Sequence, residues 1–236
     1  MRKNYAVIAA GGLGTRLKDY KDNEFTKVLI ELNGLSMIST QIKQLQSWGL
    51  ENFIIITNPE FHDLIVEDVS KNYKDLNIQY SVQESPNGIA DALSYAEDKV
   101  EDSSLVTFVL GDNFFGANPF LGIDFNSFKG AQIFVIDVEN PQEFGVMETD
   151  SKDNIINLHE KPKDYISSLA VVGLYIYEKT CFEYIKELIP SARGELEITD
   201  LNKIYMKKKL LNYKLINSWW IDAGTEDRIS ELKGLI

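Results

Sequence analysis

Short apolar runs that alternate with helical periods constrain the fold of this chain more than any other feature of its sequence. Over the first 110 residues, β-type runs at 5–10, 53–57, 78–83 and 105–110 alternate with helical patterns at 37–48, 61–69 and 90–100. That order predicts parallel strands joined by helices that cover both faces of a sheet. We therefore expect an α/β protein with a three-layer α/β/α architecture, a mainly parallel mixed sheet, and ligands at the carboxyl ends of its strands.

The second half of the chain has a mixed pattern that is typical of a continuing sheet. Strands are expected at 131–138, 145–148, 155–159 and 170–177, and helices at 181–189 and 197–209. The runs at 213–216 and 219–221 are expected to close the sheet. No repeat, low-complexity segment or linker interrupts the 236 residues, so we interpret residues 1–236 as a single domain.

Charge and residue composition exclude several classes of protein. The 24 basic and 36 acidic residues give a net charge of −12, which disfavours nucleic acid as a partner. The chain has one cysteine, Cys181, and two histidines, which excludes an internal disulfide, a cysteine-based zinc site and a histidine-rich metal cluster. No apolar run approaches the roughly 18 residues of a membrane span, and the N-terminus lacks a signal-peptide pattern. We expect a cytoplasmic protein with neither a membrane nor a nucleic-acid partner.

A glycine-rich loop follows the first strand directly. Residues 9–17 read AAGGLGTRL, and Lys27 follows a short stretch later. Glycines at this place let backbone N–H groups approach an anion closely. A P-loop string is absent, and the dinucleotide-binding fingerprint fails because Leu17 stands where its last glycine belongs. The residues leave two interpretations open: a phosphate-binding loop that carries its own cation, Arg16, or a glycine-rich turn with a solvated arginine.

Further motifs run through the whole chain in a fixed order. After the glycine loop and Lys27 come QESPNGIADA (83–92), LGDN (110–113), EFGV (143–146), EKPK (160–163), VGLY (172–175), SARGELEITD (191–200) and WWIDAGT (219–225). Together they resemble the sugar-1-phosphate nucleotidyltransferases, and within that family a short form of the glucose-1-phosphate thymidylyltransferases. The resemblance implies a nucleotide-binding part over residues 1–130 and a sugar-binding part over residues 131–236.

The reaction that this resemblance implies is attack of a sugar 1-phosphate on the α-phosphorus of a nucleoside triphosphate, with release of pyrophosphate. Both substrates are anions, so catalysis requires in-line positioning and neutralisation of charge. Arg16 and Lys27 match residues that contact the triphosphate and the reacting phosphate, and we predict that both are catalytic. Asp112 and Asp222 match the ligands of Mg²⁺, the predicted cofactor, although each taken alone could equally cap a turn or a helix.

The resemblance also implies which residues bind each substrate. The nucleotide site would consist of Ala9, Gly11, Gly12, Gly14, Thr15, Arg16, Gln83, Gly88 and Asp112. Gln83 and Gly88 match the base-reading positions, and a side-chain amide that chooses its flip can pair with N3–H and O4 of thymine or uracil. The sugar site would consist of Asn113, Gly145, Glu160, Lys161, Val172 and Glu195. Glu160 would accept hydrogen bonds from sugar hydroxyls, and Lys161 would reach the sugar phosphate.

The implied products are dTDP-glucose and pyrophosphate, made from dTTP and α-D-glucose 1-phosphate. Within the class, the alternatives are a UTP-dependent glucose-1-phosphate uridylyltransferase or a transferase for another sugar 1-phosphate. Outside it, a non-catalytic sugar-nucleotide-binding domain is disfavoured because two cations and two carboxylates are all present. A nicotinamide-dependent dehydrogenase is disfavoured because no acidic ribose ligand follows the second strand.

Two stretches of the chain depart from the family pattern. Phe25-Thr26 precedes Lys27, where the family has proline or a small polar residue, and residues 35–38 read LSMI where the family has Lys-Pro-Met-Ile. Longer thymidylyltransferases continue past the position of Ile236 with helices that carry part of an oligomer interface and an allosteric nucleotide site. The resemblance is therefore compatible with a homo-oligomer but implies no allosteric site.

Overall fold

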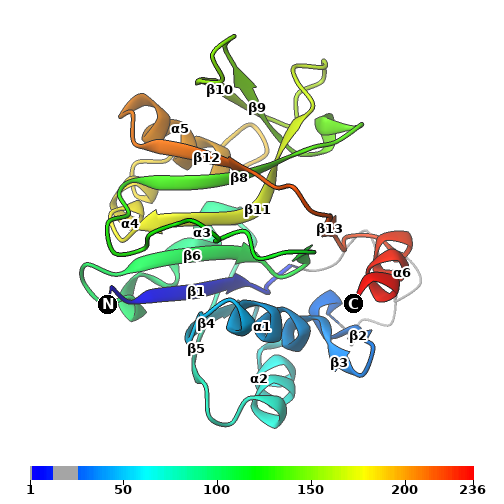
Figure 1. Ribbon diagram of the computed structural model, residues 1–236. Helices are drawn as coiled ribbons and strands as arrows, with labels where there is room; N and C mark the ends of the chain where they lie inside the picture. Colours follow the sequence, from blue (N-terminus) through cyan, green and yellow to red (C-terminus); the bar gives the residue numbers. More distant parts are fainter. Residues whose placement is uncertain (1, 13–25) are drawn as a thin grey trace.

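The computed structural model describes residues 2–12 and 26–236, and it contains a mixed sheet with helices on both faces (Figure 1). In these residues the main sheet has nine strands: seven follow the order β10-β9-β11-β6-β1-β4-β5, and β8 pairs with β11 and β12. The strands are β1 (Asn4–Ala9), β4 (Asn52–Thr57), β5 (Asn77–Val82), β6 (Leu105–Leu110), β8 (Ala131–Asp137), β9 (Gly145–Thr149), β10 (Ile155–Glu160), β11 (Leu169–Glu178) and β12 (Leu211–Leu215). The predicted three-layer α/β/α fold is confirmed.

The strands of the first half are parallel, as the alternating pattern predicts. β1 pairs in parallel with both β4 and β6, and β4 pairs in parallel with β5. Val7 lies opposite Ile54, and neither has any exposed surface, because helices cover both faces of this part of the sheet. The carboxyl ends of β1 and β6 meet at the paired residues Ala9 and Leu110, so the loops that follow both strands start at one edge.

Helices cover the two faces of the sheet in two groups. Their bounds are α1 (Met37–Ser47), α2 (His62–Asn72), α3 (Ile89–Ser94), α4 (Cys181–Ile185), α5 (Ile198–Lys207) and α6 (Glu226–Leu235). The apolar stripes of α1 and α2 enter one buried cluster, which includes Ile42 and Ile65. The stripes of α3, α4 and α5 enter the cluster on the opposite face, which includes Leu93, Phe182 and Leu201.

The second half of the sheet is mainly antiparallel. β11 pairs antiparallel with β6, β8 and β9, and β9 and β10 form a hairpin, which projects at the top of Figure 1. The register between β11 and β8 shifts between Val171 and Tyr175. This irregular stretch contains Gly173, which borders the site described below.

The prediction that residues 219–221 close the main sheet is wrong. β13 (Trp220–Asp222) instead pairs antiparallel with β7 (Asn113–Phe115) in a separate two-stranded sheet. β7 follows β6 in the chain, and β13 pairs with it. Helix α6 packs against this pair through a small apolar cluster that includes Phe114, Ile221 and Ile229. A second small hairpin joins β2 (Glu31–Leu32) to β3 (Leu35–Ser36).

Two predicted helices are shorter than their sequence periods suggest. The segment 90–100 forms α3 only to Ser94 and then a 3₁₀ helix, Glu97–Lys99, while the helix that begins at Cys181 ends at Ile185. Apolar spacing marks a buried face, and a loop or 3₁₀ turn that packs on the core shows the same spacing. Among the described helices, none combines the length and apolar character that crossing a bilayer would require.

Candidate active site

Two neighbouring cavities open beyond the carboxyl ends of β1 and β6. The first, of about 310 Å³, lies between the start of the glycine loop, Lys27 and the N-terminal end of α3. The second, of about 260 Å³, lies between the β9–β10 hairpin, β11, α5 and β13. Four residues line both cavities: Ile89, Leu110, Asp112 and Glu195. One ligand could therefore span from the first cavity into the second.

The beginning of the glycine loop borders the first cavity, as expected for an anion-binding loop. Ala9, Gly11 and Gly12 all line it. The Asn58 side chain, just after β4, donates from Nδ2 to the Gly11 carbonyl at 3.1 Å and accepts the Phe61 N–H at its Oδ1. Asn58 thus fixes the backbone at the start of the loop. The sequence predictions for Gly14, Thr15 and Arg16 lie outside the described residues.

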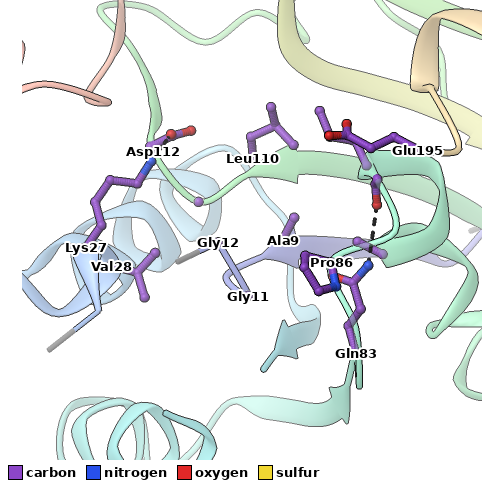
Figure 2. Close-up of a pocket in the computed structure, with 14 residues that line it drawn as sticks. Ala9, Gly11, Gly12, Lys27, Val28, Gln83, Pro86, Leu110, Asp112 and Glu195 are labelled. Carbon is purple, nitrogen blue, oxygen red and sulfur yellow. Dashed lines mark hydrogen bonds and ion pairs between the residues drawn. The ribbon is translucent and has the colours of Figure 1, made fainter. Parts of the chain in front are cut away.

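Lys27 and Asp112 form an ion pair where the two cavities meet. Lys27 begins a 3₁₀ helix, Lys27–Leu29, and its Nζ contacts Asp112 Oδ2. Both side chains are mostly buried, at 12% and 13% exposed. Figure 2 shows the two side chains pointing toward one another at one end of the first cavity, with Gln83 at the other end. The predicted cation and the predicted metal ligand are therefore neighbours in space.

Asp112 and Asp222 are brought together by the β7–β13 pair. Asp222 lies opposite Asn113 in the pairing register, and the Ala223 N–H donates to the Asp112 carbonyl at 2.8 Å. Both aspartates line the second cavity. Two carboxylates that line one cavity are a donor set that suits Mg²⁺, which takes one or two carboxylates and completes its shell with water and phosphate oxygens. The residues present thus fit the expected cofactor.

Asn113 lines the second cavity, where the sugar site is expected, but its polar side-chain atoms contact protein groups. Its side chain is 2% exposed, and its Oδ1 accepts the backbone N–H of Gly173 at 2.9 Å and the indole Nε1–H of Trp220 at 2.8 Å. Its Nδ2 donates to Asp112 Oδ1 at 2.8 Å. Because both partners of Oδ1 can only donate, the orientation of this amide is fixed by its surroundings. Asn113 ties β7 to β11 and β13 and orients the Asp112 carboxylate.

Gln83 lies at the carboxyl end of β5, on the far side of the first cavity from Lys27. Its backbone N–H donates to the Thr57 carbonyl at 2.8 Å, which extends the β4–β5 pairing by one step. Its side chain is largely buried and donates from Nε2 to Asp91 Oδ2 at 2.7 Å and more weakly to the Gly88 carbonyl at 3.4 Å, the dashed line in Figure 2. Gln83 and Gly88 thus lie together on the wall of the first cavity.

Gly88 makes a close backbone contact that the sequence did not reveal. Its φ is +113°, and a Cβ placed on it would lie 2.5 Å from the carbonyl oxygen of Leu196. The Leu196 N–H donates to the Asn87 carbonyl at 2.7 Å, and its carbonyl accepts the Ala90 N–H at 3.1 Å. Glycine is thus required for the docking of segment 191–197 against the loop that precedes α3.

The second cavity is lined by most of the residues expected to bind a sugar. Gly145, Glu160, Lys161 and Glu195 all border it. The Thr199 hydroxyl donates to Glu160 Oε2 at 2.5 Å, and a Cβ on Gly145 would lie 3.2 Å from the same hydroxyl, which explains a small residue there.

Val172 differs from the other expected sugar-binding residues. Its side chain is buried in the core on the face of the sheet that carries α1 and α2. Its neighbours Val171 and Gly173 line the second cavity instead. Val172 could contribute to that cavity only through its backbone.

Arg193 and Tyr175 also line the second cavity, although sequence reasoning gave them no role. The Arg193 guanidinium contacts Glu197 at 2.8 Å and Glu160 at 3.3 Å, and the hydrogen bond with Glu197 raises the pKa of Arg193. Burial and the charge of Glu160 raise the pKa of the Tyr175 phenol, so it stays a hydrogen-bond donor. Both residues stand inside the quoted motifs, but their side-chain directions depend on tertiary packing.

Comparison with known proteins places this site in a family. The chain matches the nucleotidyl transferase family over residues 5–234. It is 34% identical over 239 residues to a glucose-1-phosphate thymidylyltransferase of Neisseria gonorrhoeae, covering 98% of this chain and 81% of that protein. A glucose-1-phosphate thymidylyltransferase of Mycobacterium tuberculosis H37Rv is 34% identical over 232 residues, covering 94% and 78%.

A solved structure extends the likeness to three dimensions. A Bacillus anthracis protein assigned as a glucose-1-phosphate thymidylyltransferase, crystallised with a sucrose, superposes with a TM-score of 0.88 at 36% identity, covering 98% of this chain and 94% of that one. The chain belongs to the nucleotidyl transferase family. Within it the protein is an enzyme, a sugar-1-phosphate nucleotidyltransferase that resembles the glucose-1-phosphate thymidylyltransferases over nearly its whole length.

Proposed function

We propose that this enzyme makes dTDP-glucose and pyrophosphate from dTTP and α-D-glucose 1-phosphate, and that it also accepts UTP. The observation that carries the proposal is the meeting of two cavities at the Lys27–Asp112 ion pair. An amide suited to a pyrimidine, Gln83, lies in the first cavity, and a carboxylate suited to sugar hydroxyls, Glu160, lies in the second. The names of the relatives support the choice of dTTP and glucose 1-phosphate.

In the proposed reaction, an oxygen of the sugar phosphate forms a bond to the α-phosphorus of the triphosphate. The bond from that phosphorus to the pyrophosphate oxygen breaks, and pyrophosphate leaves with the electron pair. No covalent intermediate on the protein is needed, so the residues act by placing the two anions in line and stabilising their charge. The junction of the two cavities is where the reacting groups would meet.

Lys27 is proposed to stabilise the charge that gathers at the α-phosphate. When a triphosphate enters the first cavity, its anionic oxygens can replace Asp112 as the partner of the Lys27 ammonium group. A positioned cation in a largely buried site stabilises developing charge far better than one in water. Arg16 is proposed as a second cation, since a guanidinium matches phosphate oxygens in pairs.

Asp112 and Asp222 are proposed to hold Mg²⁺. When bound, the ion would neutralise part of the charge of the phosphates. The chain itself has a net charge of −12 and does not balance that charge. Asn113 keeps one oxygen of Asp112 in place through its 2.8 Å hydrogen bond, and β13 keeps Asp222 beside it.

Glu160 is proposed to accept hydrogen bonds from sugar hydroxyls, in a position fixed by Thr199. Lys161 and Arg193 supply positive charge at the same cavity and would attract the sugar phosphate. Residues 1–130 are proposed to supply most of the nucleotide part of the site and residues 131–236 most of the sugar part, with Glu195 lining both cavities.

A matrix assay tests this proposal. The protein is supplied with Mg²⁺, with each of dTTP, UTP, CTP, ATP and GTP, and with a panel of sugar 1-phosphates, and pyrophosphate release is measured. We expect the highest kcat/KM with glucose 1-phosphate and dTTP, and UTP within about a hundredfold, because the C5 methyl group alone is worth about 1–3 kcal/mol.

Two variants serve as controls for the assay. Asp112→Asn should lose turnover by orders of magnitude, whereas Asp164→Asn, at an exposed position, should not. A wild-type preference for ATP, CTP or a different sugar 1-phosphate would overturn the substrate assignment.

A further inference from the structure

We infer that Asp91 determines the choice of base by fixing the orientation of the Gln83 amide. This inference rests on the proposed function, because it requires that Gln83 face the base of the nucleotide. Asp91 lies in the first turn of α3 and is not part of the lining of the first cavity. It would therefore act through Gln83, as a positioning residue.

The contacts of the amide allow one orientation. Gln83 Nε2 lies 2.7 Å from Asp91 Oδ2 and 3.4 Å from the Gly88 carbonyl oxygen. An ionised carboxylate and a backbone carbonyl can only accept hydrogen bonds. If the amide were flipped, Oε1 would face these two acceptors, and a largely buried contact between acceptors is unfavourable. The partners of the amide thus fix its orientation chemically.

This orientation gives the amide a defined preference among bases. With Nε2 held by Asp91 and Gly88, the carbonyl oxygen Oε1 is the atom of the amide that can face a nucleotide. Thymine and uracil carry a donor at N3, which Oε1 can accept. Cytosine carries an acceptor at N3. If cytosine were bound, two acceptors, N3 and Oε1, would face one another with no proton to share, which is unfavourable. An amide that was free to flip would pair equally well with thymine and with cytosine. Discrimination between these bases therefore depends on Asp91, which fixes the orientation of the Gln83 amide.

Asp91 itself is held in place by its own turn of helix. The Ser94 hydroxyl donates to the Asp91 carbonyl at 2.7 Å, and the neighbouring Ala90 and Ala92 are buried against the core. Ala90 N–H is in turn bound to the Leu196 carbonyl at 3.1 Å. The carboxylate is therefore presented to Gln83 from a fixed backbone, which an orienting role requires.

The test is the ratio of kcat/KM for dTTP to kcat/KM for CTP, measured with saturating glucose 1-phosphate and Mg²⁺ on the full chain. Asp91→Asn keeps the shape of the side chain but can present either a donor or an acceptor to Gln83. We expect this ratio to fall by about tenfold or more, since one mispaired buried hydrogen bond is worth at least that factor. The values for dTTP and UTP should fall together and by only a few-fold.

Further variants make the result specific to the amide. Asp98→Asn, at an exposed aspartate paired with Lys99, is the matched control and should keep the wild-type ratio. Asp91→Ala should lower the ratio as Asp91→Asn does, which guards against poor folding of either variant. In a Gln83→Ala background, Asp91→Asn should leave the ratio unchanged within about twofold, because the two residues act through one contact.

The outcomes separate this inference from the proposed function. If wild type prefers dTTP and UTP over CTP but folded Asp91→Asn and Asp91→Ala keep that ratio, the role of Asp91 is refuted and the proposed function stands. If wild type has no preference for dTTP and UTP, the proposed function fails and the inference fails with it. A ratio that collapses in both Asp91 variants but not in Asp98→Asn supports the inference.

Discussion

Replacing Asn113 with aspartate would put a carboxylate oxygen where the Nδ2 donor now contacts Asp112. The wild-type distance is 2.8 Å, and the side chain is 2% exposed. The two hydrogen bonds that Oδ1 accepts from Gly173 and Trp220 would survive, because aspartate keeps an acceptor there. The substitution therefore changes one interaction from attraction to repulsion with almost no change in shape.

The size of the effect follows from that distance. Two negative charges 2.8 Å apart repel by about 6 kcal/mol at an effective dielectric constant of about 20. The Lys27 ammonium on the other oxygen of Asp112 and local relaxation offset part of this, so we expect a loss of about 3 kcal/mol in the free energy of unfolding. Repulsion and burial raise the pKa of the new carboxyl above its ordinary value of about 4. The destabilisation is then absent at low pH and grows as pH rises above about 4.

Urea unfolding at pH 4.5 and pH 8 measures this directly. The deficit of Asn113→Asp relative to wild type should be about 2 kcal/mol larger at pH 8 than at pH 4.5. Asn113→Ala, the control without added charge, loses all three hydrogen bonds of the Asn113 side chain, so its deficit should be large at both pH values and vary with pH much less than that of Asn113→Asp. Turnover of Asn113→Asp should also fall at pH 8, because the Asp112 carboxylate is displaced. Equal deficits at both pH values for Asn113→Asp would refute the account of Asn113 as the donor that orients Asp112.

Three further features can be tested by substitution or by a change of pH. Lys27→Ala should lower both kcat and kcat/KM by about a hundredfold or more, and an effect on KM alone would limit Lys27 to ground-state binding. Gly88→Ala should lower the free energy of unfolding by at least about 2 kcal/mol in urea titrations, because of its φ of +113° and the 2.5 Å approach to Leu196; a near-neutral result would show that segment 191–197 can move away. Burial raises the pKa of Cys181 and of Tyr177 in the folded protein. The free energy of unfolding should therefore be unaffected by these groups at neutral pH and should fall above about pH 8.5, because they ionise first in the unfolded chain. The fall should be at most about 1.4 kcal/mol per pH unit for each group. Tyr177→Phe should flatten that fall above about pH 10, and an unchanged slope would contradict the assignment.

The parallel half of the fold could be predicted because its signals are local. β1, β4 and β6 are mostly apolar runs that are largely buried, and helix α1 between β1 and β4 has an apolar stripe of its own. The carboxyl-end positions of Ala9, Gln83 and Asp112 follow from that order, and all three line one cavity. Element ends were less accurate, since α3 ends at Ser94 although apolar spacing continues to Val100.

The orientations of the site side chains could not be predicted because they depend on distant partners. The role of Asn113 is set by Gly173 and Trp220, which lie 60 and 107 positions away along the chain. The pairing of β13 with β7 has no local signal either, because a run of three apolar residues suits either sheet. For Gln83, sequence reasoning showed that the amide must choose a flip, but its partner Asp91 became visible only in three dimensions.

The β7–β13 pair has a consequence for the order in which the enzyme acquires its site. The two carboxylates are separated by 110 positions, from 112 to 222, and closing a loop of that length costs about 4 kcal/mol of chain entropy. Such contacts form late in folding, after the local β-α-β units. Trp220 donates its indole N–H to Asn113 and stacks edge-on against Phe144 with ring centroids 5.1 Å apart, so its fluorescence should change at this step. In a refolding experiment on a variant that carries Trp48→Phe and Trp219→Phe, the remaining indole signal of Trp220 and the return of turnover should share their slowest phase, while backbone circular dichroism recovers earlier.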